Sequence, residues 1–290
     1  MESSRLMDLA ERLRAALPID TIEALDGGYQ SRVFEAVGPS GRLVVKVQDA
    51  SLVDRAALVT RLDVVAALAE LDPGVCRPLS VGETRLVELC TDGQVEHYVT
   101  CFDFAAGAPP DPARATDAEQ MGAALARLHR SMLRLAPFPL PAVAALNTST
   151  AAEEPTESGD QQLLHGDFNV GNLRLDAGTV RIFDFDDCGY GPPAFDVANA
   201  LYLVLFDERT SGRAGIFERF RASFLRGYVA ESGSPLTDEA IDRFIDLRVD
   251  ALGAWIDDLD HAPVGIRTAS PIWLATLRDF VVDHRRRSGG

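Results

Sequence analysis

Two neighbouring segments decide the fold: Leu163-Leu164-His165-Gly166-Asp167-Phe168-Asn169-Val170-Gly171-Asn172-Leu173 and Arg181-Ile182-Phe183-Asp184-Phe185-Asp186-Asp187. Short apolar runs at 162–164 and 180–183 predict two strands. Each predicted strand delivers an aspartate, Asp167 or Asp184, into the loop at its end. A carboxylate placed in this way can accept a proton, and a second one can hold a hard metal ion together with an amide oxygen.

The pattern His-x-Asp-x-x-x-x-Asn, followed by a strand that ends in Asp, is typical of the catalytic and metal loops of the protein-kinase mechanism. Asp167 would be the base, Asn172 and Asp184 would hold Mg²⁺ on nucleotide phosphates, and His165 would position the loop. The alternative is that His165 and Asp167 only hydrogen-bond across a turn. Agreement in residue type, order and strand context disfavours it. A transition-metal site is disfavoured because no second histidine or cysteine lies at ligand spacing nearby.

These segments resemble the aminoglycoside phosphotransferase and choline kinase-like family of small-molecule kinases, which has a protein-kinase-like fold. The glycine of the protein-kinase Asp-Phe-Gly is absent here, and Asp184-Phe185-Asp186-Asp187 stands in its place. The later segment Pro193-Ala194-Phe195-Asp196-Val197-Ala198 resembles the family too. The resemblance implies that Asp196 is a buried support for the backbone of the catalytic loop. We take Asp186 and Asp187 as candidate substrate-binding residues.

Composition narrows the class of protein. A chain of 290 residues with 47% hydrophobic content can bury a large core. Its formal net charge of -16 disfavours nucleic acid or an anionic membrane as a partner. The four cysteines are scattered without a Cys-x-x-Cys, which favours reduced thiols in a cytoplasmic protein. Charged residues within 1–17 argue against a signal peptide or a membrane span there.

One basic residue differs from all the others. Of the 28 basic residues, 27 are arginines and one is a lysine, Lys46. It lies in an apolar run, 42–47, that predicts a strand resembling the kinase strand whose lysine holds the α and β phosphates. A compact ammonium suits that contact; the alternative is an exposed lysine on an edge strand. Kinases pair this lysine with a helical Glu, whereas this chain offers Asp63 or, as a fallback, Asp54; the alternative is that either aspartate is an ordinary solvated helix residue.

Other residues are candidates for nucleotide contacts. The loop with Gly28, Tyr29, Gln30 and Ser31 joins two predicted strands and could cover phosphates with its backbone N–H groups. Its glycines lack the full Gly-x-Gly-x-x-Gly spacing, so a plain hairpin turn is the alternative. By resemblance, backbone groups near Asp103 and Ala105 would contact adenine.

The order of predicted elements favours an α+β fold with two lobes. Strands and a helix at 51–71 form an N-lobe, residues 1–103, that contains an antiparallel sheet, and residues 104–290 form a mainly helical C-lobe. Thr116, with Glu119 three residues later, predicts a capping box at the start of the first C-lobe helix. We expect the nucleotide to bind in the cleft between the lobes.

The sequence therefore predicts a kinase that uses ATP (or GTP) and Mg²⁺ to phosphorylate a hydroxyl group of a small molecule, such as an aminoglycoside, a sugar or an amino alcohol. A protein Ser/Thr kinase of the same fold is one alternative, although no Ala-Pro-Glu segment follows Asp184. A nucleotide-binding scaffold without catalysis is another.

One acidic helix face is a candidate for binding the acceptor. The pattern predicts a helix at 250–261, in which Asp257 and Asp258 lie away from the apolar stripe. Such carboxylates would favour a cationic or hydroxyl-rich acceptor. The alternative is an acidic face that is merely solvated.

Overall fold

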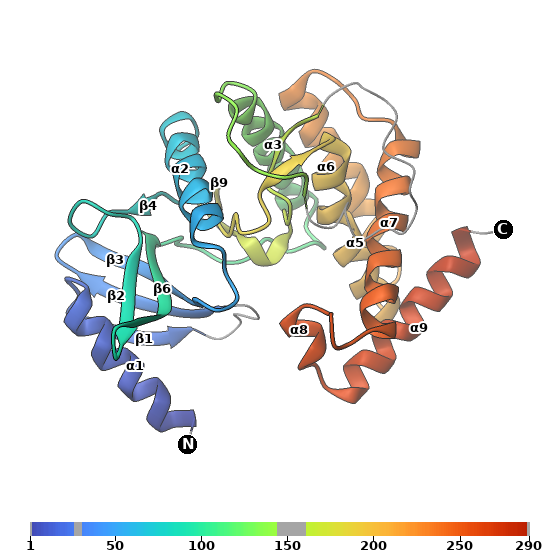
Figure 1. Ribbon diagram of the computed structural model, residues 1–290. Coiled ribbons are helices and arrows are strands. Elements are labelled where there is room, and N and C mark those ends of the chain that lie inside the picture. Colours follow the sequence, from blue (N-terminus) through green and yellow to red (C-terminus); the bar gives the residue numbers. More distant parts are fainter. Residues whose placement is uncertain (1, 26–30, 144–160, 289–290) are drawn as a thin grey trace. The chain divides into compact units, whose positions relative to one another are not determined.

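The computed structural model describes residues 2–25, 31–143 and 161–288, and it divides the chain into two compact units (Figure 1). The first comprises the residues up to Ala69 together with Cys76–Ala105, and the second comprises Glu70–Val75 and the residues from Ala106 onward. The expected α+β fold, with a sheet in the N-terminal region and helices in the C-terminal region, is confirmed. Within the described ranges, no helix combines the length and apolarity needed to span a bilayer.

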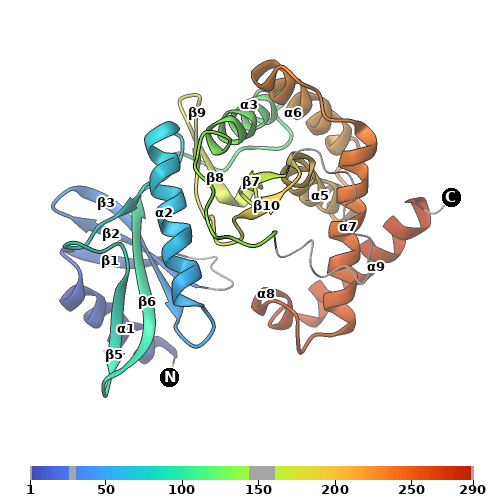
Figure 2. The same ribbon diagram turned by 45° about the horizontal axis from the view of Figure 1, so that its top comes forward.

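The first unit is built on one antiparallel sheet (Figure 2). Its strands lie in the order β1-β2-β3-β6-β4, and β5 pairs with β6 beside β4. Glycine at 41 has a φ of 103°, which allows the tight turn from β2 into β3. The strands are β1 Thr21–Leu25, β2 Arg32–Gly38, β3 Gly41–Asp49, β4 Pro78–Leu79, β5 Val87–Thr91 and β6 Gln94–Asp103.

Two helices cover opposite faces of this sheet, α1 Glu2–Ala16 and α2 Arg55–Leu71. Successive strand residues point to opposite faces. Val99 and Cys101 of β6 belong to the apolar cluster that holds the buried leucines of α1. Their neighbour Tyr98 instead packs with Leu58 and Leu62 of α2. Residues of β6 therefore pack into apolar layers on both faces of the sheet. A shift of one residue would exchange these faces, so the packing fixes the register of β6 in the sheet.

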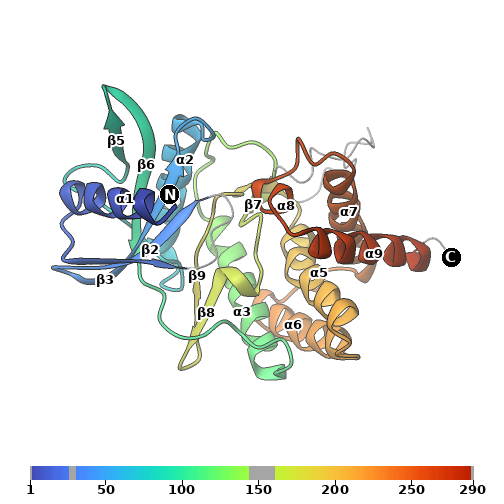
Figure 3. The ribbon, with the colours of Figure 1, turned by 90° about the horizontal axis from the view of Figure 1, so that it is seen from below.

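The second unit is mainly helical (Figure 3). α3 packs against α6, and α7 packs against both α5 and α9. Two small antiparallel pairs, β7 with β10 and β8 with β9, lie among the helices. The helices are α3 Ala115–Met132, α5 Pro193–Ser211, α6 Ile216–Ser232, α7 Asp238–Asp257, α8 Val264–Arg267 and α9 Pro271–Ser288. The strands are β7 Gln162–Leu164, β8 Leu173–Asp176, β9 Thr179–Ile182 and β10 Gly189–Gly191.

Two glycines set the spacing of α3 and α6. A Cβ atom on Gly122 would lie 1.9 Å from the carbonyl oxygen of Phe224. A Cβ atom on Gly227 would lie 2.0 Å from the carbonyl oxygen of Glu119. No real side chain tolerates such distances, so the two backbones touch directly and each helix needs its glycine.

The capping box expected at Thr116 is wrong. α3 begins at Ala115 after Arg114, and no side chain caps it. The Thr116 hydroxyl instead donates to Asp117, whose other carboxylate oxygen accepts the backbone N–H of Asp111 at 3.0 Å. Glu119 pairs with Arg226 of α6 at 3.4 Å. The acidic groups of this first turn therefore fix the incoming chain and the helix pair rather than the cap.

Candidate active site

The catalytic loop begins where β7 ends, at His165. This side chain is fully buried and lies against the ring of Phe185, with ring centroids 4.4 Å apart. Its Nδ1 accepts the backbone N–H of Asp167 at 3.3 Å, so its Nε2 donates to the carbonyl oxygen of Phe183 at 3.1 Å. Burial lowers the pKa of His165, which keeps the ring neutral in this arrangement. His165 thus fastens the catalytic loop to the segment that carries Asp184.

Asp167 and Asn172 face each other across a short helical turn, Val170–Asn172. The Asn172 amide nitrogen donates to a carboxylate oxygen of Asp167 at 2.9 Å and to the Asp167 carbonyl oxygen at 2.9 Å. Asn169 begins the turn by accepting the N–H of Gly171 at 2.8 Å. Because both contacts of Asn172 use its nitrogen, its amide oxygen is directed elsewhere and can act as a ligand.

Asp184 lies one residue beyond Phe183, which follows the end of β9 at Ile182. The N–H of Phe183 donates to the Asn172 carbonyl oxygen at 3.2 Å, which joins the two loops one residue before Asp184. The φ of Asp184 is 67°, in the left-handed region that residues other than glycine rarely adopt. Backbone strain of this kind is concentrated at functional sites. The strand end therefore turns sharply to present this carboxylate.

A fully buried carboxylate, Asp196 in the first turn of α5, holds the loop backbone. It accepts the N–H groups of His165 at 2.8 Å and Gly166 at 2.9 Å, and His129 of α3 contacts it at 3.1 Å. Burial is the largest single influence and would raise the pKa of Asp196, but the hydrogen bonds from His129 and the Gly166 N–H, together with the charges of His129 and His165, lower the pKa overall. Asn199, one turn later, donates to the Gly166 carbonyl oxygen at 2.7 Å. α5 thus fixes both sides of the peptide at Gly166.

Glycine is required at 166 for two reasons. Its φ is 85°, and a Cβ atom there would lie 2.0 Å from the carbonyl oxygen of Asp187. The catalytic loop and the chain after Asp184 therefore approach each other by backbone contact, which a larger residue would prevent.

The electrostatic environment of Asp167 is unusual for a carboxylic acid. Burial, followed by the charges of Asp187 and Asp184, raises the pKa of Asp167 to about 7. Arg248 of α7 and the hydrogen bond from Asn172 act in the opposite direction. A carboxylate whose pKa lies near neutral pH is suited to accept a proton from a hydroxyl group.

This raised pKa predicts a pH-dependent gain in stability for Asp167→Asn. The unfolded chain releases the proton near pH 3.8 and the folded protein near pH 7, so the loss of wild-type stability grows as the pH rises from 3.8 to 7 and is complete above pH 7. The amide cannot ionise. We therefore expect the melting temperature of the variant to exceed that of the wild type by at least about 3 °C at pH 8, and by clearly less at pH 5.

Thermal unfolding at several pH values measures this difference. Asp176→Asn, at an exposed position at the end of β8, is the matched control and should show no gain that grows with pH. Equal gains for both variants at pH 8 would contradict the assignment of a raised pKa to Asp167.

Lys46 lies on β3, which is flanked by β2 and β6, and only 9% of the residue is exposed. The alternative of an exposed lysine on an edge strand is therefore wrong. Its neighbours Val45 and Val47 face the α1 layer, so Lys46 points to the face that α2 covers. Thr100 of β6 is its cross-strand partner.

The pairing expected between Asp63 and Lys46 is wrong. Asp63 forms an ion pair with Arg85 at 3.1 Å and is largely exposed on α2. The fallback, Asp54, accepts the N–H of Ala57 at 2.7 Å and thereby caps the start of α2. Asp63 thus takes part in a surface ion pair, and Asp54 caps the N-terminus of α2.

The remaining nucleotide candidates are only partly covered by the structure. Gly28, Tyr29 and Gln30 lie outside the described residues, and Ser31 is a half-buried residue directly before β2. Asp103 closes β6, where its N–H donates to the Arg77 carbonyl oxygen at 2.9 Å. Ala105 is the last residue of the first unit.

The candidates for acceptor binding fall into two groups. Asp186 and Asp187 belong to the segment that follows Asp184, next to the catalytic loop. Asp257 and Asp258 lie exposed at the end of α7, which stops at Asp257 rather than continuing to 261. There His261 contacts the Asp258 carboxylate at 2.8 Å.

One residue near this site, Arg248, belongs to none of the motifs found in the sequence. Arg248, in the third turn from the end of α7, interacts electrostatically with Asp167 and Asp187. Helical periodicity gives no reason to single out this arginine among the 27.

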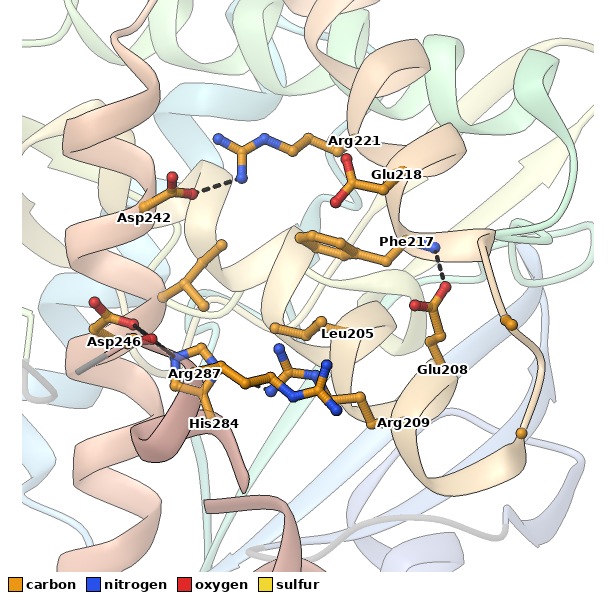
Figure 4. Close-up of a pocket in the computed structure, with 14 residues that line it drawn as sticks. Leu205, Glu208, Arg209, Phe217, Glu218, Arg221, Asp242, Asp246, His284 and Arg287 are labelled. Atoms are coloured by element: carbon orange, nitrogen blue, oxygen red, sulfur yellow. Dashed lines mark hydrogen bonds and ion pairs between the residues drawn. The ribbon is translucent and has the colours of Figure 1, made fainter. Parts of the chain in front are cut away.

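A cavity of about 640 Å³ lies elsewhere in the second unit, between α5, α6, α7 and α9 (Figure 4). Two pairs of its side chains are in contact: Arg221 with Asp242 at 2.5 Å, and His284 with Asp246 at 2.6 Å. No residue of the catalytic loop lines it. We therefore regard it as separate from the candidate active site.

Three comparisons place the chain among known proteins. A model of the phosphotransferase enzyme family matches residues 21–154 and 133–240. Amicoumacin kinase of Bacillus subtilis (strain 168) is 34% identical over 80 residues, which are 27% of this chain and 24% of that protein. The match thus spans about a quarter of the curated relative's length.

Two solved structures are similar over nearly their whole length. An amicoumacin kinase in complex with AMP-PNP, Ca²⁺ and Ami has a TM-score of 0.74 and 17% identity, covering 96% of this chain and 93% of that chain. A microcompartment-associated aminopropanol kinase has a TM-score of 0.73 and 18% identity, covering 98% of each chain. At these identities the similarity shows a shared fold.

The family match covers most of the chain and both segments from which the resemblance was inferred. Together its two overlapping ranges extend from residue 21 to 240 of the 290 residues, and they include Lys46, Asp167 and Asp184. The resemblance to small-molecule kinases is thereby confirmed. The chain belongs to the phosphotransferase enzyme family.

Proposed function

We propose that this protein is an ATP- and Mg²⁺-dependent kinase that phosphorylates a hydroxyl group of a small molecule. The observation that carries the proposal is the joined pair of loops, in which Asp167, Asn172 and Asp184 are held together by backbone and side-chain hydrogen bonds. The family match supports phosphoryl transfer as the reaction class. Two similar proteins are named as kinases of amicoumacin and of aminopropanol, which supports a small molecule as the acceptor.

Asp167 would act as the base. Its carboxylate would accept a hydrogen bond from the acceptor hydroxyl, orient the oxygen toward the γ-phosphate and take the proton as the new bond forms. The N–H donor from Asn172 occupies one carboxylate oxygen at 2.9 Å and fixes its direction. Positioning, more than covalent chemistry, would therefore be the contribution of this loop.

The oxygen donors fit a magnesium site. The Asn172 amide oxygen and the Asp184 carboxylate are hard ligands on adjacent loops, as Mg²⁺ prefers, with phosphates and water supplying the remaining positions. No group of three His, Cys, Asp or Glu side chains at metal-binding spacing occurs within the described residues. When bound, the metal would neutralise charge on the phosphate oxygens. Asn172 and Asp184 would hold and orient it.

Lys46 would hold the α and β phosphates of the nucleotide. Its position on an inner strand, with 9% of the residue exposed, gives a defined place to an ammonium that would otherwise remain in water. Ser31 and the loop before it would cover the phosphates, and backbone groups near Asp103 and Ala105 would contact the base. Asp257 and Asp258 would border the acceptor.

We expect Lys46→Arg to lower kcat/KM for the nucleotide by about 100-fold although the charge is retained. A planar guanidinium is larger and cannot bring one compact charge between two phosphates from an inner strand. Steady-state kinetics with varied ATP measure the effect. Arg14→Lys, an exposed exchange on α1, is the control and should leave the kinetics unchanged. Near-normal kinetics of Lys46→Arg would remove Lys46 from the nucleotide site.

The function itself is tested by coupled ADP release with a library of hydroxyl compounds, with and without Mg²⁺. Amino alcohols form the first panel because the relatives' names point to amine-bearing acceptors. Acceptor-dependent release that needs Mg²⁺ and disappears in Asp167→Asn is the expected result. Release from a protein substrate alone would favour the protein-kinase alternative. Mg²⁺-dependent nucleotide binding with no release in any panel would favour a non-catalytic scaffold.

A further inference from the structure

The inference concerns Arg248 of α7. Its guanidinium carbon lies 5.0 Å from the ring centre of Tyr202 and 5.7 Å from that of Phe195, both on α5. Its Nη2 donates to the Tyr202 hydroxyl at 3.2 Å. Phe195 directly precedes Asp196, which holds the catalytic loop. Arg248 is thus placed by α5, the helix that also holds the catalytic loop.

The charge of Arg248 acts on the catalytic loop. Burial opposes the charge, but Tyr202 and then the carboxylates of Asp167 and Asp187 raise the pKa of Arg248 above its usual value. Even so, among the residues that the structure describes, no ion pair joins Arg248 to a carboxylate, and its buried Nε has no hydrogen-bond acceptor. The charges of Asp167 and Asp187 therefore act on Arg248 without an ion pair to either carboxylate.

Other contacts of α7 show how different this is. Asp238 and Asp242 pair with Arg221 at 2.8 and 2.5 Å, and Asp250, two residues after Arg248, pairs with Arg285 at 2.8 Å. Each of these exposed aspartates forms an ion pair with an arginine. Arg248 is more deeply buried than Arg221, and its side-chain hydrogen bond goes to the neutral hydroxyl of Tyr202.

This state has an energetic cost. An unsatisfied buried donor such as the Arg248 Nε costs about 1–3 kcal/mol. If Arg248 only packed α5 against α7, an apolar side chain would do so without that cost. A buried polar group without a partner calls for an explanation, and a bound anion is one that fits an arginine. A guanidinium next to a catalytic loop is suited to a planar, doubly bonded anion such as a carboxylate.

We propose that Arg248 binds a carboxylate of the acceptor, so that the preferred substrate carries an anionic group beside the hydroxyl that is phosphorylated. The inference rests on the proposed function and adds the class of acceptor to it. It differs from the cationic acceptor suggested by Asp257 and Asp258, which lie exposed roughly 14 Å further along α7. Arg248 is a specificity residue in this scheme, and Asp167 remains the base.

Binding is tested first, without turnover. The full-length protein is titrated with 4-hydroxybutyrate, and thermal unfolding is followed at constant ionic strength, with 4-hydroxybutyramide and inorganic phosphate as comparison probes. The hydroxy acid should stabilise the wild type and have at least about a tenfold weaker effect on Arg248→Gln, in terms of the concentration required. Stabilisation by phosphate alone, or equal stabilisation of both proteins, would overturn the proposal.

Two further variants separate binding from packing. Arg243→Gln removes an exposed arginine from the same helix and should behave as the wild type. Tyr202→Phe removes only the hydroxyl that orients the guanidinium, so it should retain most of the response. If Arg248→Gln does not fold, Arg248→Lys keeps the charge but not the planar fork, and it should show the same loss of carboxylate response. A full response in that variant would overturn the proposal.

Turnover provides the second readout. Matched pairs, 4-hydroxybutyrate with its amide and serine with serinamide, are compared by ADP release. The wild type should prefer the carboxylate member by at least about tenfold in kcat/KM, and Arg248→Gln should lose the preference mainly through KM. A preference for the amides would overturn the proposal. Carboxylate binding that depends on Arg248, without Mg²⁺-dependent ADP release from any hydroxyl compound, would instead overturn the proposed function and leave the binding site standing.

Discussion

Asp167→Asn should lower kcat by about 1,000-fold or more and leave the binding of Mg²⁺-ATP nearly unchanged. The amide has the shape of the carboxylate and can still accept the hydrogen bond that Asn172 donates at 2.9 Å. It cannot take the proton of the acceptor hydroxyl. General-base catalysis contributes about 10²–10⁴-fold, and correct orientation of the hydroxyl depends on the same oxygen atoms.

Single-turnover phosphorylation of the best acceptor measures the chemical step, and titration with nucleotide measures binding. The Asp176→Asn variant, at the exposed end of β8, serves as the control for a lost negative charge. Turnover within tenfold of the wild type would show that another group accepts the proton, and the assignment of Asp167 as base would then be withdrawn.

Asp184→Asn should abolish turnover as well, but through a different step. A neutral amide is a much weaker ligand for Mg²⁺ than a carboxylate, so the metal-nucleotide complex loses one of its two protein ligands. Asparagine tolerates the left-handed backbone found at Asp184, where φ is 67°, so the loop should keep its course. We expect the affinity for Mg²⁺-ATP to fall by at least about tenfold, together with a loss of kcat of about 1,000-fold.

Calorimetric titration with ATP in the presence of Mg²⁺, and again with EDTA, separates metal-dependent from metal-independent binding. In the wild type the two titrations should differ widely, and in Asp184→Asn they should nearly coincide. Unchanged metal-dependent affinity in this variant would show that Asp184 is not a metal ligand.

The sequence predicted the elements whose patterns are local. The strand that carries Lys46 and the two strands before Asp167 and Asp184 follow from short apolar runs. The segment from His165 to Asn172 could be interpreted because its functional groups lie close together in the chain. Its internal hydrogen bonds connect residues only two to five positions apart.

Contacts between distant residues could not be predicted in this way. The sequence suggested Asp63 as the partner of Lys46, but Arg85, 22 residues later, takes it. Likewise, the motif Thr116 to Glu119 indicated a capping box, whereas Glu119 pairs with Arg226, 107 residues away. Helix propensity and spacing carry no information on such partners, because tertiary packing decides them.

Arg248 shows the same limit at the candidate active site. Nothing in its helix distinguishes it from other arginines, and its relevance arises only because α5 and α7 pack together. The residues that perform chemistry stand in a motif, whereas a residue that selects the acceptor comes from a helix whose position depends on the whole second unit.

The direct backbone contact of α3 with α6, at Gly122 and Gly227, limits which substitutions these two helices can accept during evolution. His129 on α3 contacts both Tyr228, the neighbour of Gly227, and Asp196, so the helix spacing is transmitted to the catalytic loop. Gain of a single methyl group at either glycine would shift His129 and so appear as a defect in turnover. The acceptor side can therefore diversify through α7, while the α3–α6 pair stays constrained in every descendant that retains this loop.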